Sequence, residues 1–510
     1  MDLLLGVGPA LTGFFGNIGM GFSVALTWQN LVLCFIGCLL GTIIGVLPGI
    51  GPLTTMAMVL PFTFWLGPVG ALIMLSGVFY GAQYGGSTTA ILVKIPGETS
   101  SVVTILDGHA MAVQGRAGPA LAIAAIASLF AGSVVTLLIA AAGPPLASIA
   151  LLFHSADYVS VMLLGLVSAV VLAHGSVLKA VAMIVLGVLF GLVGTDTQSG
   201  AYRMTMGLDV LFDGLGFVPI SMGVFGLAEI MYNIEHGAAH ASPPGRVTGL
   251  MPTMRDLLTC LPAMVRGTAV GTAFGILPGG GPTIAAFSAY TLEKKVSGTP
   301  QRFGNGAIEG VAAPEAANNA AAQACFIPML SLGIPPNALM ALMIGAMMIH
   351  GIQPGPNIIA KQPELFWGLI ASMWIGNAML VILNLPLIGI WVRLLQVPYG
   401  YLFPTILVFC CIGTYALNSS TGEVLIMTAF GVIGYVFRKL DCEPAPLLLG
   451  LVLGPLLEEN FRRALQLSAG DWSVFVTRPL SLAFLLAALA LLVAVTLPGI
   501  RRGREQAFRE

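Results

Sequence analysis

The stretch Gly-Val-Leu-Pro-Gly-Ile-Gly-Pro at residues 45–52 returns as Gly-Ile-Leu-Pro-Gly-Gly-Gly-Pro at residues 275–282. Pro278 lies 230 positions after Pro48, which is nearly half of the 510-residue chain. Each copy follows a long apolar run, at residues 31–47 and 257–277. The block cannot continue a helix, because proline lacks the backbone N–H and glycine is conformationally permissive. The same break twice in a hydrophobic chain predicts a transporter of two repeats, with a site formed by broken helices near the middle of the membrane.

The composition is that of an integral membrane protein. The chain is 57% hydrophobic, its mean hydropathy is +0.94, and only 8% of its residues are charged, against about 25% in soluble proteins. Many apolar runs approach the roughly 20 residues that span a bilayer as a helix. We therefore expect an all-α integral membrane protein with about 10–12 transmembrane helices, some of them broken or re-entrant. The net charge of −1 argues against nucleic acid as a partner.

The breaks and the polar stretches divide the chain. We expect an N-terminal interfacial segment (1–24), a first membrane repeat (25–236), a linker loop (237–255), a second membrane repeat (256–500) and a basic tail (501–510). Four arginines in the tail put the C-terminus in the cytoplasm by the positive-inside rule, whereas the N-terminal side is ambiguous. A second break follows each Pro-Gly block, at residues 95–99 and 334–338. We favour inverted over parallel repeats.

The Pro-Gly blocks can serve as ion sites. Each block leaves unpaired carbonyl groups at the end of one helix and free N–H groups at the start of the next. Free N–H groups suit a carboxylate, and free carbonyl groups suit Na⁺. The alternative is a tight turn buried in protein. The residues expected to shape the site are Pro48, Gly49, Gly51, Pro52, Pro96, Gly97, Pro278, Gly279, Gly281, Pro282, Pro335 and Pro336.

Neutral polar side chains lie between the breaks. Hydroxyl and amide groups can bind a carboxylate without a buried charge, and they can also coordinate Na⁺. Close helix packing is the competing explanation, because small and polar residues also serve it. Thr99 and Asn337 can equally be helix caps. The candidate substrate-binding residues are Ser87, Thr88, Thr89, Asn318, Asn319, Thr99 and Asn337.

Charged residues are few within the two halves. Glu309 and Glu315 are the candidates for cation coupling, because intramembrane carboxylates are costly and usually functional. The polar segment 107–116 reads as an exposed loop. No ATP-binding loop, zinc-protease motif or serine-hydrolase motif is present, so we expect neither an enzyme nor a cofactor.

Several longer motifs resemble a known family. The stretches at residues 41–52, 80–90, 95–99, 304–319 and 332–337 are similar to the TctA family, the large membrane subunit of tripartite tricarboxylate transporters. The resemblance covers about residues 20–500. It implies a multi-pass permease of the bacterial inner membrane with two partners, a small TctB-like membrane subunit and a periplasmic TctC-like solute-binding protein. It further implies import of a small carboxylate coupled to a cation gradient, usually of Na⁺.

The sequence thus predicts a secondary active permease that works by alternating access. Two other functions stay open at this point. An anion-conducting channel can also be built from small residues and broken helices. An ion-coupled transporter without a binding protein would share the same membrane features. A membrane enzyme would need a cluster of acids, bases or metal ligands, which the sequence does not show.

Overall fold

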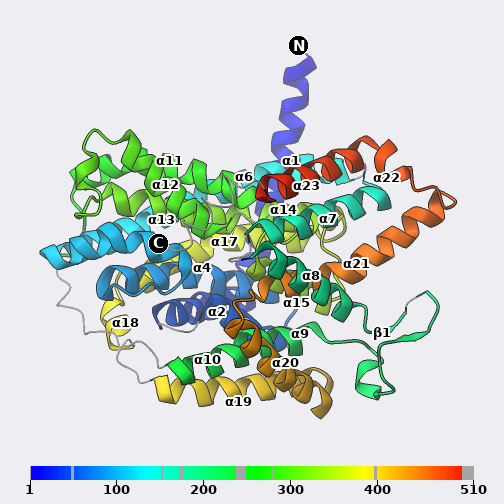
Figure 1. The fold of residues 1–510 in the computed structure, drawn as a ribbon. Coiled ribbons are helices and arrows are strands. Elements are labelled where there is room, and N and C mark those ends of the chain that lie inside the picture. Colours follow the sequence, from blue (N-terminus) through cyan, green and yellow to red (C-terminus); the bar gives the residue numbers. More distant parts are fainter. Residues whose placement is uncertain are drawn as a thin grey trace.

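The computed structural model describes residues 2–47, 51–150, 153–172, 176–196, 198–236, 249–277, 281–355, 357–394 and 399–496. These residues are almost entirely helical (Figure 1). The strands among them form one two-stranded antiparallel sheet, β1 with β2. The predicted all-α membrane fold is therefore confirmed.

Residues 2–236 form α1 (Asp2–Ala25), α2 (Trp28–Val46), α3 (Pro52–Thr63), α4 (Pro68–Val93), η1 (Thr99–Ser101), α5 (Val102–Thr104), η2 (Ile105–His109), η3 (Ala112–Arg116), α6 (Ala117–Ala150), α7 (Ser155–Leu172), α8 (Val177–Gly191), β1 (Gly194–Thr195), β2 (Tyr202–Arg203), η4 (Asp209–Leu211), α9 (Phe217–Ser221), η5 (Met222–Leu227) and α10 (Ala228–His236). The segments η2, η3 and η5 are π-helical.

Residues 249–496 form α11 (Met254–Ile276), α12 (Pro282–Val296), η6 (Pro300–Arg302), α13 (Glu309–Ala324), α14 (Phe326–Leu332), α15 (Ala338–Ile349), α16 (Ile358–Lys361), α17 (Pro363–Asn384), α18 (Ile388–Leu394), α19 (Tyr399–Asn418), α20 (Thr421–Lys439), α21 (Ala445–Leu467), α22 (Val474–Thr477) and α23 (Pro479–Thr496). The expected linker falls largely on residues 237–248, and the basic tail on residues 501–510. Both lie outside the described residues.

Within the described residues, six helical stretches are long and apolar enough to cross a membrane. They are Trp28–Val46, Ala112–Ala142, Phe217–Glu235, Met254–Ile276, Pro363–Asn384 and Thr421–Lys439. Six shorter apolar helices, such as Pro52–Thr63 and Ala338–Ile349, accompany them. This combination of full-length and short apolar helices fits a multi-pass protein in which some helices are broken.

The first Pro-Gly block joins two helices of a three-helix unit, α2–α3–α4. Glycines at every fourth position of α2 let α4 approach so closely that a Cβ at Gly37, Gly41 or Gly45 would lie 2.1–2.4 Å from a carbonyl oxygen of α4. Those carbonyls belong to Met74, Val78 and Ala82, in the same order, so the two helices run parallel. Helix α3 returns from the end of α2 to the start of α4. Such backbone-to-backbone contact is how small residues join helices in lipid.

The second block joins a unit of the same design, α11–α12–α13. A Cβ at Gly267, Gly271 or Gly275 would lie 2.3–2.6 Å from the carbonyl oxygens of Ala313, Ala317 and Ala321. Each of these α11 glycines lies 230 positions after its α2 counterpart. The shared packing supports two related units, and their relative orientation stays a prediction.

Helices α11 and α12, which the second Pro-Gly block connects, form an antiparallel hairpin and lie side by side in Figure 1. Arg266 on α11 and Glu293 on α12 form a two-point ion pair, with N···O distances of 2.8 and 2.6 Å. Gly281 has φ +118°, which a side chain would disfavour, whereas Gly51 has φ −80° and can be replaced without backbone strain. New helices begin at the last proline of each block, Pro52 and Pro282, as suits a residue without an N–H.

The patch around Ser87 lies within one continuous helix, because α4 runs from Pro68 to Val93 through it. One detail of the sequence interpretation was wrong. The segment 107–116 is not an exposed loop, because it is helical and the Asp107 side chain is fully buried. Asp107 accepts hydrogen bonds from three backbone N–H groups of the loop 304–307 and from the Tyr290 hydroxyl.

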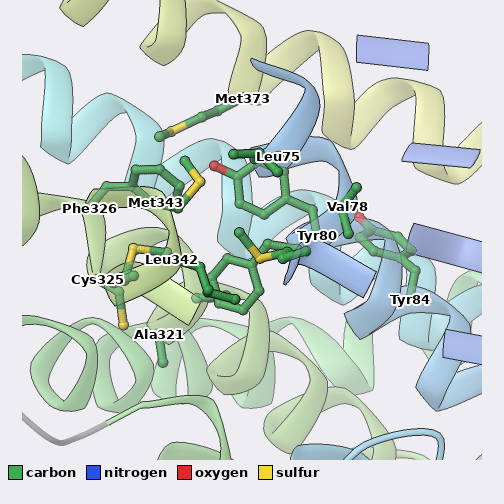
Figure 2. Packing of buried hydrophobic residues seen from close by; sticks show 14 of the residues in the cluster. Leu75, Val78, Tyr80, Tyr84, Ala321, Cys325, Phe326, Leu342, Met343 and Met373 are labelled. Atoms are coloured by element: carbon green, nitrogen blue, oxygen red, sulfur yellow. The ribbon is translucent and has the colours of Figure 1, made fainter. Parts of the chain in front are cut away.

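The core lies where α4 meets α14, α15 and α17 (Figure 2). In Figure 2, Tyr80 of α4 lies among Phe326, Met343 and Met373, and the ring centroids of Tyr80 and Phe326 are 6.0 Å apart. In a membrane such packing supplies dispersion energy, since lipid tails already solvate apolar side chains. The core fixes α4 against the second half of the chain.

The β1–β2 hairpin projects from the helical body (Figure 1). Within it, the Asp196 carboxylate accepts hydrogen bonds from the Gln198 N–H at 3.1 Å and the Ser199 hydroxyl at 2.8 Å. It also pairs with Arg462 at 3.1 Å. The hydrogen bonds, followed by the ion pair, lower the pKa of Asp196 to about 2.

Candidate transport site

The end of α2 and the start of α12 both reach the segment 95–101, which carries the second break of the first half. Gly97 lies in a narrow space between α2 and α4: a Cβ there would lie 2.0 Å from the Gly45 carbonyl oxygen and 2.4 Å from the Gly86 Cα. Two residues further, the Thr99 hydroxyl forms a 2.8 Å hydrogen bond with that of Thr283, in the first turn of α12. One short segment therefore touches the end of α2 and the start of α12.

The second break of the other half also reaches this region. Asn337 caps α15 by accepting the Met340 N–H at 2.9 Å, which confirms its expected capping role. Its Nδ2 lies 4.0 Å from the Cβ position of Gly281, in the turn of the α11–α12 hairpin. The N-terminal ends of α12 and α15 thus lie close together. Pro335 and Pro336 are buried just before that cap.

The groups around this junction are accessible. Thr99 is exposed, and Gly51, Pro52, Pro96, Gly97, Pro282, Thr283 and Asn337 are partly exposed. Free N–H groups and the positive end of the helix dipole attract a carboxylate to a helix start. Pro48, Gly49, Pro278 and Gly279 lie outside the described residues.

The predicted polar patches meet deeper in the protein. The Ser87 hydroxyl on α4 lies 2.7 and 2.8 Å from the two carboxylate oxygens of Glu315 on α13. The Thr104 hydroxyl of α5 also donates to Glu315. Glu315 is 1% exposed. The two patches, 228 positions apart in the sequence, therefore come together around one buried carboxylate.

A second carboxylate, from Glu98, lies beside this contact. The Glu98 Cγ would be 2.9 Å from a Cβ placed on Gly86, the residue before Ser87. The Ser100 hydroxyl contacts the Glu98 carboxylate and lies 3.0 Å from the Gln83 Oε1. Glu98, and not Thr99, is the N-cap of η1, so the expected capping role of Thr99 was wrong.

The remaining patch residues differ in their partners. Thr88 and Thr89 donate to the α4 carbonyls of Tyr84 and Gly86, as expected for helix packing. Asn319 donates to the Ser128 hydroxyl of α6 at 2.6 Å. Both amide atoms of Asn318 are buried and have no hydrogen-bond partner.

Glu309 lies apart from Glu315. Its carboxylate pairs with Arg302 at 3.4 Å, at the start of α13. Among the described residues, no group of three histidine, cysteine, aspartate or glutamate side chains has the arrangement of a metal site. A site for a hard monovalent cation would instead combine carboxylate, hydroxyl and carbonyl oxygens.

A small cavity of about 10 Å³ opens next to Glu315. Its polar lining comes from Tyr84, Ser87, Thr88, Ser128, Glu315 and Asn384. This volume is about that of one water-sized sphere. In this conformation it has room for a water molecule or a small ion, but not for an organic acid.

The sequence interpretation missed Gln83, Glu98, Thr104 and Thr283. Glu98 had a visible signal, because it is a carboxylate within a helix break of an apolar chain. Thr283 directly follows the Pro-Gly-Gly-Gly-Pro block, but nothing in the sequence shows that it meets Thr99. Thr104 and Gln83 carry no local signal.

The helical membrane fold, with helix breaks and buried polar side chains gathered around α4 and α13, defines a polytopic membrane transport protein. The chain belongs to the tripartite tricarboxylate transporter TctA family, whose family model matches residues 31–449.

Two curated relatives come from Agrobacterium vitis. An uncharacterized 52.8 kDa protein in the TAR-I ttuC' 3' region is 54% identical over 494 residues, which cover 97% of this chain and 98% of the relative. An uncharacterized protein in the TAR-II ttuC' 3' region is 55% identical over 240 residues, covering 47% of this chain and 99% of the relative. No solved structure matches the chain.

Proposed function

We propose that this chain forms the translocation pathway of a secondary active transporter that imports a small carboxylate across the bacterial inner membrane. The observation that carries the proposal is that the end of α2 and the start of α12 both contact residues 95–101, through the Gly97–Gly45 and Thr99–Thr283 contacts. Helix breaks that meet in this way form the substrate and ion sites of many transporters. Family membership supports the same function.

The carboxylate binds at the accessible junction of the breaks. Its oxygens accept hydrogen bonds from the N–H groups at the start of α12 and from the Thr99 and Thr283 hydroxyls. The Asn337 amide lies beside the same turn. This placement uses the groups that are open to solvent, and it keeps the anion out of the small cavity beside Glu315.

The predicted site residues then divide between two ligands. Thr99 and Asn337 belong with the carboxylate. The buried carboxylate of Glu315 lies beside Ser87, Thr88 and Asn318. A negatively charged substrate would be repelled by this carboxylate. The three side chains suit the coupling cation, while Thr89 and Asn319 position α4 and α13.

Basic residues support an orientation. Arg116 pairs with Asp256 at 3.0 Å, and Gln114 donates to the Asn305 carbonyl at 2.9 Å, so the starts of α6 and α11 and the loop before α13 share one end. Arg302 belongs to that loop. The positive-inside rule puts this end in the cytoplasm. We place the C-terminus there too, as expected from its arginines.

Two partners complete the transporter: a TctB-like membrane subunit and a periplasmic TctC-like binding protein that delivers the carboxylate. The membership of this chain in a tripartite family supports both. Energy comes from a cation gradient, with Na⁺ as the proposed ion. Transport by alternating access requires the junction to open to each side of the membrane in turn.

Uptake of labelled citrate or succinate into proteoliposomes tests this function. The vesicles contain this chain and the small subunit, with the binding protein added outside. We expect accumulation above the external concentration under an inward Na⁺ gradient, and none with choline in place of Na⁺. Equilibration that stops at equal concentrations would indicate a channel. Accumulation that does not need the binding protein would indicate a simpler ion-coupled transporter.

A further inference from the structure

The buried carboxylate of Glu315 and the partly buried carboxylate of Glu98 lie close to each other without a compensating positive charge. Glu98 lies against Gly86 and Glu315 against Ser87, which are successive residues of α4. Their described hydrogen-bond donors are neutral groups, namely the hydroxyls of Ser87, Ser100 and Thr104 and the backbone N–H of Ser101. Within the described part of the chain, neither carboxylate forms an ion pair. Buried charges normally pair with an opposite charge or bind a metal ion.

Unpartnered amide groups point to a missing ligand at the same place. Asn318 lies three residues after Glu315 on α13, so the two side chains share one face of the helix. Asn318 is 1% exposed, and neither of its amide atoms has a hydrogen-bond partner. The buried Oδ1 of Asn384, a residue that lines the cavity beside Glu315, is also unpartnered. Buried polar atoms without partners are rare, and each calls for an explanation such as an ion.

The size and the chemistry of the space select the ligand. A cavity of about 10 Å³ admits one small ion. Its lining of carboxylate, hydroxyl and amide oxygens is the ligand set of hard cations, and it lacks the nitrogen and sulfur ligands of transition metals. A monovalent ion such as Na⁺ loses its hydration shell at a modest cost, whereas Mg²⁺ dehydrates reluctantly.

We propose that the cavity beside Glu315 is a Na⁺-binding site between α4 and α13. Glu315, Ser87, Thr88 and Asn384 line it, and the neighbouring Glu98, Thr104 and Asn318 support it. The inference rests on the proposed transport function in one respect, namely that this ion is the coupling ion. The site also explains how substrate and cation communicate. Glu98 lies against Gly86, next to the cavity residue Ser87, while the adjacent Thr99 contacts Thr283 at the junction where the carboxylate binds. Binding of the cation therefore orders the segment 95–101, which also serves the carboxylate site, and binding of the carboxylate has the same effect on the cation site.

Na⁺ binding to the purified full-length chain tests the site without any transport. Equilibrium binding of ²²Na⁺ is measured in choline buffer for wild type, Glu98→Gln, Glu315→Gln and Asn318→Ala. The control is Glu459→Gln, since Glu459 is an exposed carboxylate that pairs with Arg463. We expect saturable binding in wild type and in the control. We expect at least about 10-fold weaker binding in the three site variants, as is typical when ligands or their supporting residues are lost.

Melting curves show whether the variants fold. We expect Na⁺, but not K⁺ or choline, to raise the melting temperature of wild type and Glu459→Gln, and to leave that of Glu315→Gln unchanged. If the single variants Glu98→Gln and Glu315→Gln are folded and both bind ²²Na⁺ with unaltered affinity, the proposed site is overturned. A wild type that binds no Na⁺ would overturn it as well. If Na⁺ binds as expected but reconstituted vesicles take up no carboxylate, the cation site stands and the proposed function fails.

Discussion

Gly97→Ala is expected to separate the break at residues 95–101 from the helices that hold it. The new methyl group would lie 2.0 Å from the Gly45 carbonyl oxygen and 2.4 Å from the Gly86 Cα. Both are backbone atoms, so neither can rotate away, and α2 and α4 must move apart. Gly97 does not have a positive φ, so the cost is steric. Overpacking of a tight interior costs about 1–3 kcal/mol, and contact with two backbones puts Gly97→Ala near 3 kcal/mol.

The control is Gly51→Ala in the first Pro-Gly block. Its Cβ would meet nothing within 4 Å, and its φ of −80° suits alanine. Melting can be followed in detergent with a thiol-reactive dye, because five of the seven cysteines are buried and become reactive only on unfolding. We expect a lower melting temperature and lost carboxylate uptake for Gly97→Ala, with Gly51→Ala close to wild type. Equal melting temperatures and uptake in both variants would refute the proposed contact.

Three further predictions concern other buried or paired side chains. Asp107→Ala leaves backbone N–H groups of residues 304–307 without an acceptor, so melting should show a loss of about 3 kcal/mol or more. Asn319→Ala removes the donor to Ser128 and should cost about 1–3 kcal/mol by the same assay. The pKa of Asp196 is lowered to about 2. The ionised carboxylate therefore stabilises the β1–β2 hairpin fully above pH about 4, and this stabilisation declines as the pH falls toward 2. Hydrogen exchange of the β1–β2 hairpin should therefore be equally protected at pH 7 and pH 5, and faster at both in Asp196→Asn.

The features that the sequence predicted correctly depend on local chemistry. Proline has no N–H to donate within a helix, so the helix ends before each Pro-Gly block and new helices begin at Pro52 and Pro282. Asn337 was recognisable as a cap because its short side chain can reach the N–H three residues ahead. The membrane class follows from composition alone.

The features that the sequence could not supply depend on contacts between distant segments. The polar segment 107–116 reads as a loop, yet Asp107 is buried because backbone N–H groups about 200 residues away satisfy it. The two Pro-Gly blocks read alike, yet of the equivalent described residues Gly51 and Gly281, Gly281 alone adopts a backbone conformation that demands glycine. The contact between Ser87 and Glu315 depends on the register of α4 against α13, which no local pattern encodes.

The most direct measurement is the concentration dependence of carboxylate uptake by the reconstituted complex that carries Thr99→Ala and Thr283→Ala together. The two hydroxyls meet at 2.8 Å where the start of α12 reaches the segment 95–101. Thr428→Ala is the matched control, because its exposed hydroxyl bonds only to the carbonyl of its own helix. We expect the double variant to keep its melting temperature and to raise KM for citrate or succinate by at least about 10-fold, equal to 1.4 kcal/mol of binding. A double variant with the KM and maximal rate of Thr428→Ala would contradict a substrate site at the converging breaks.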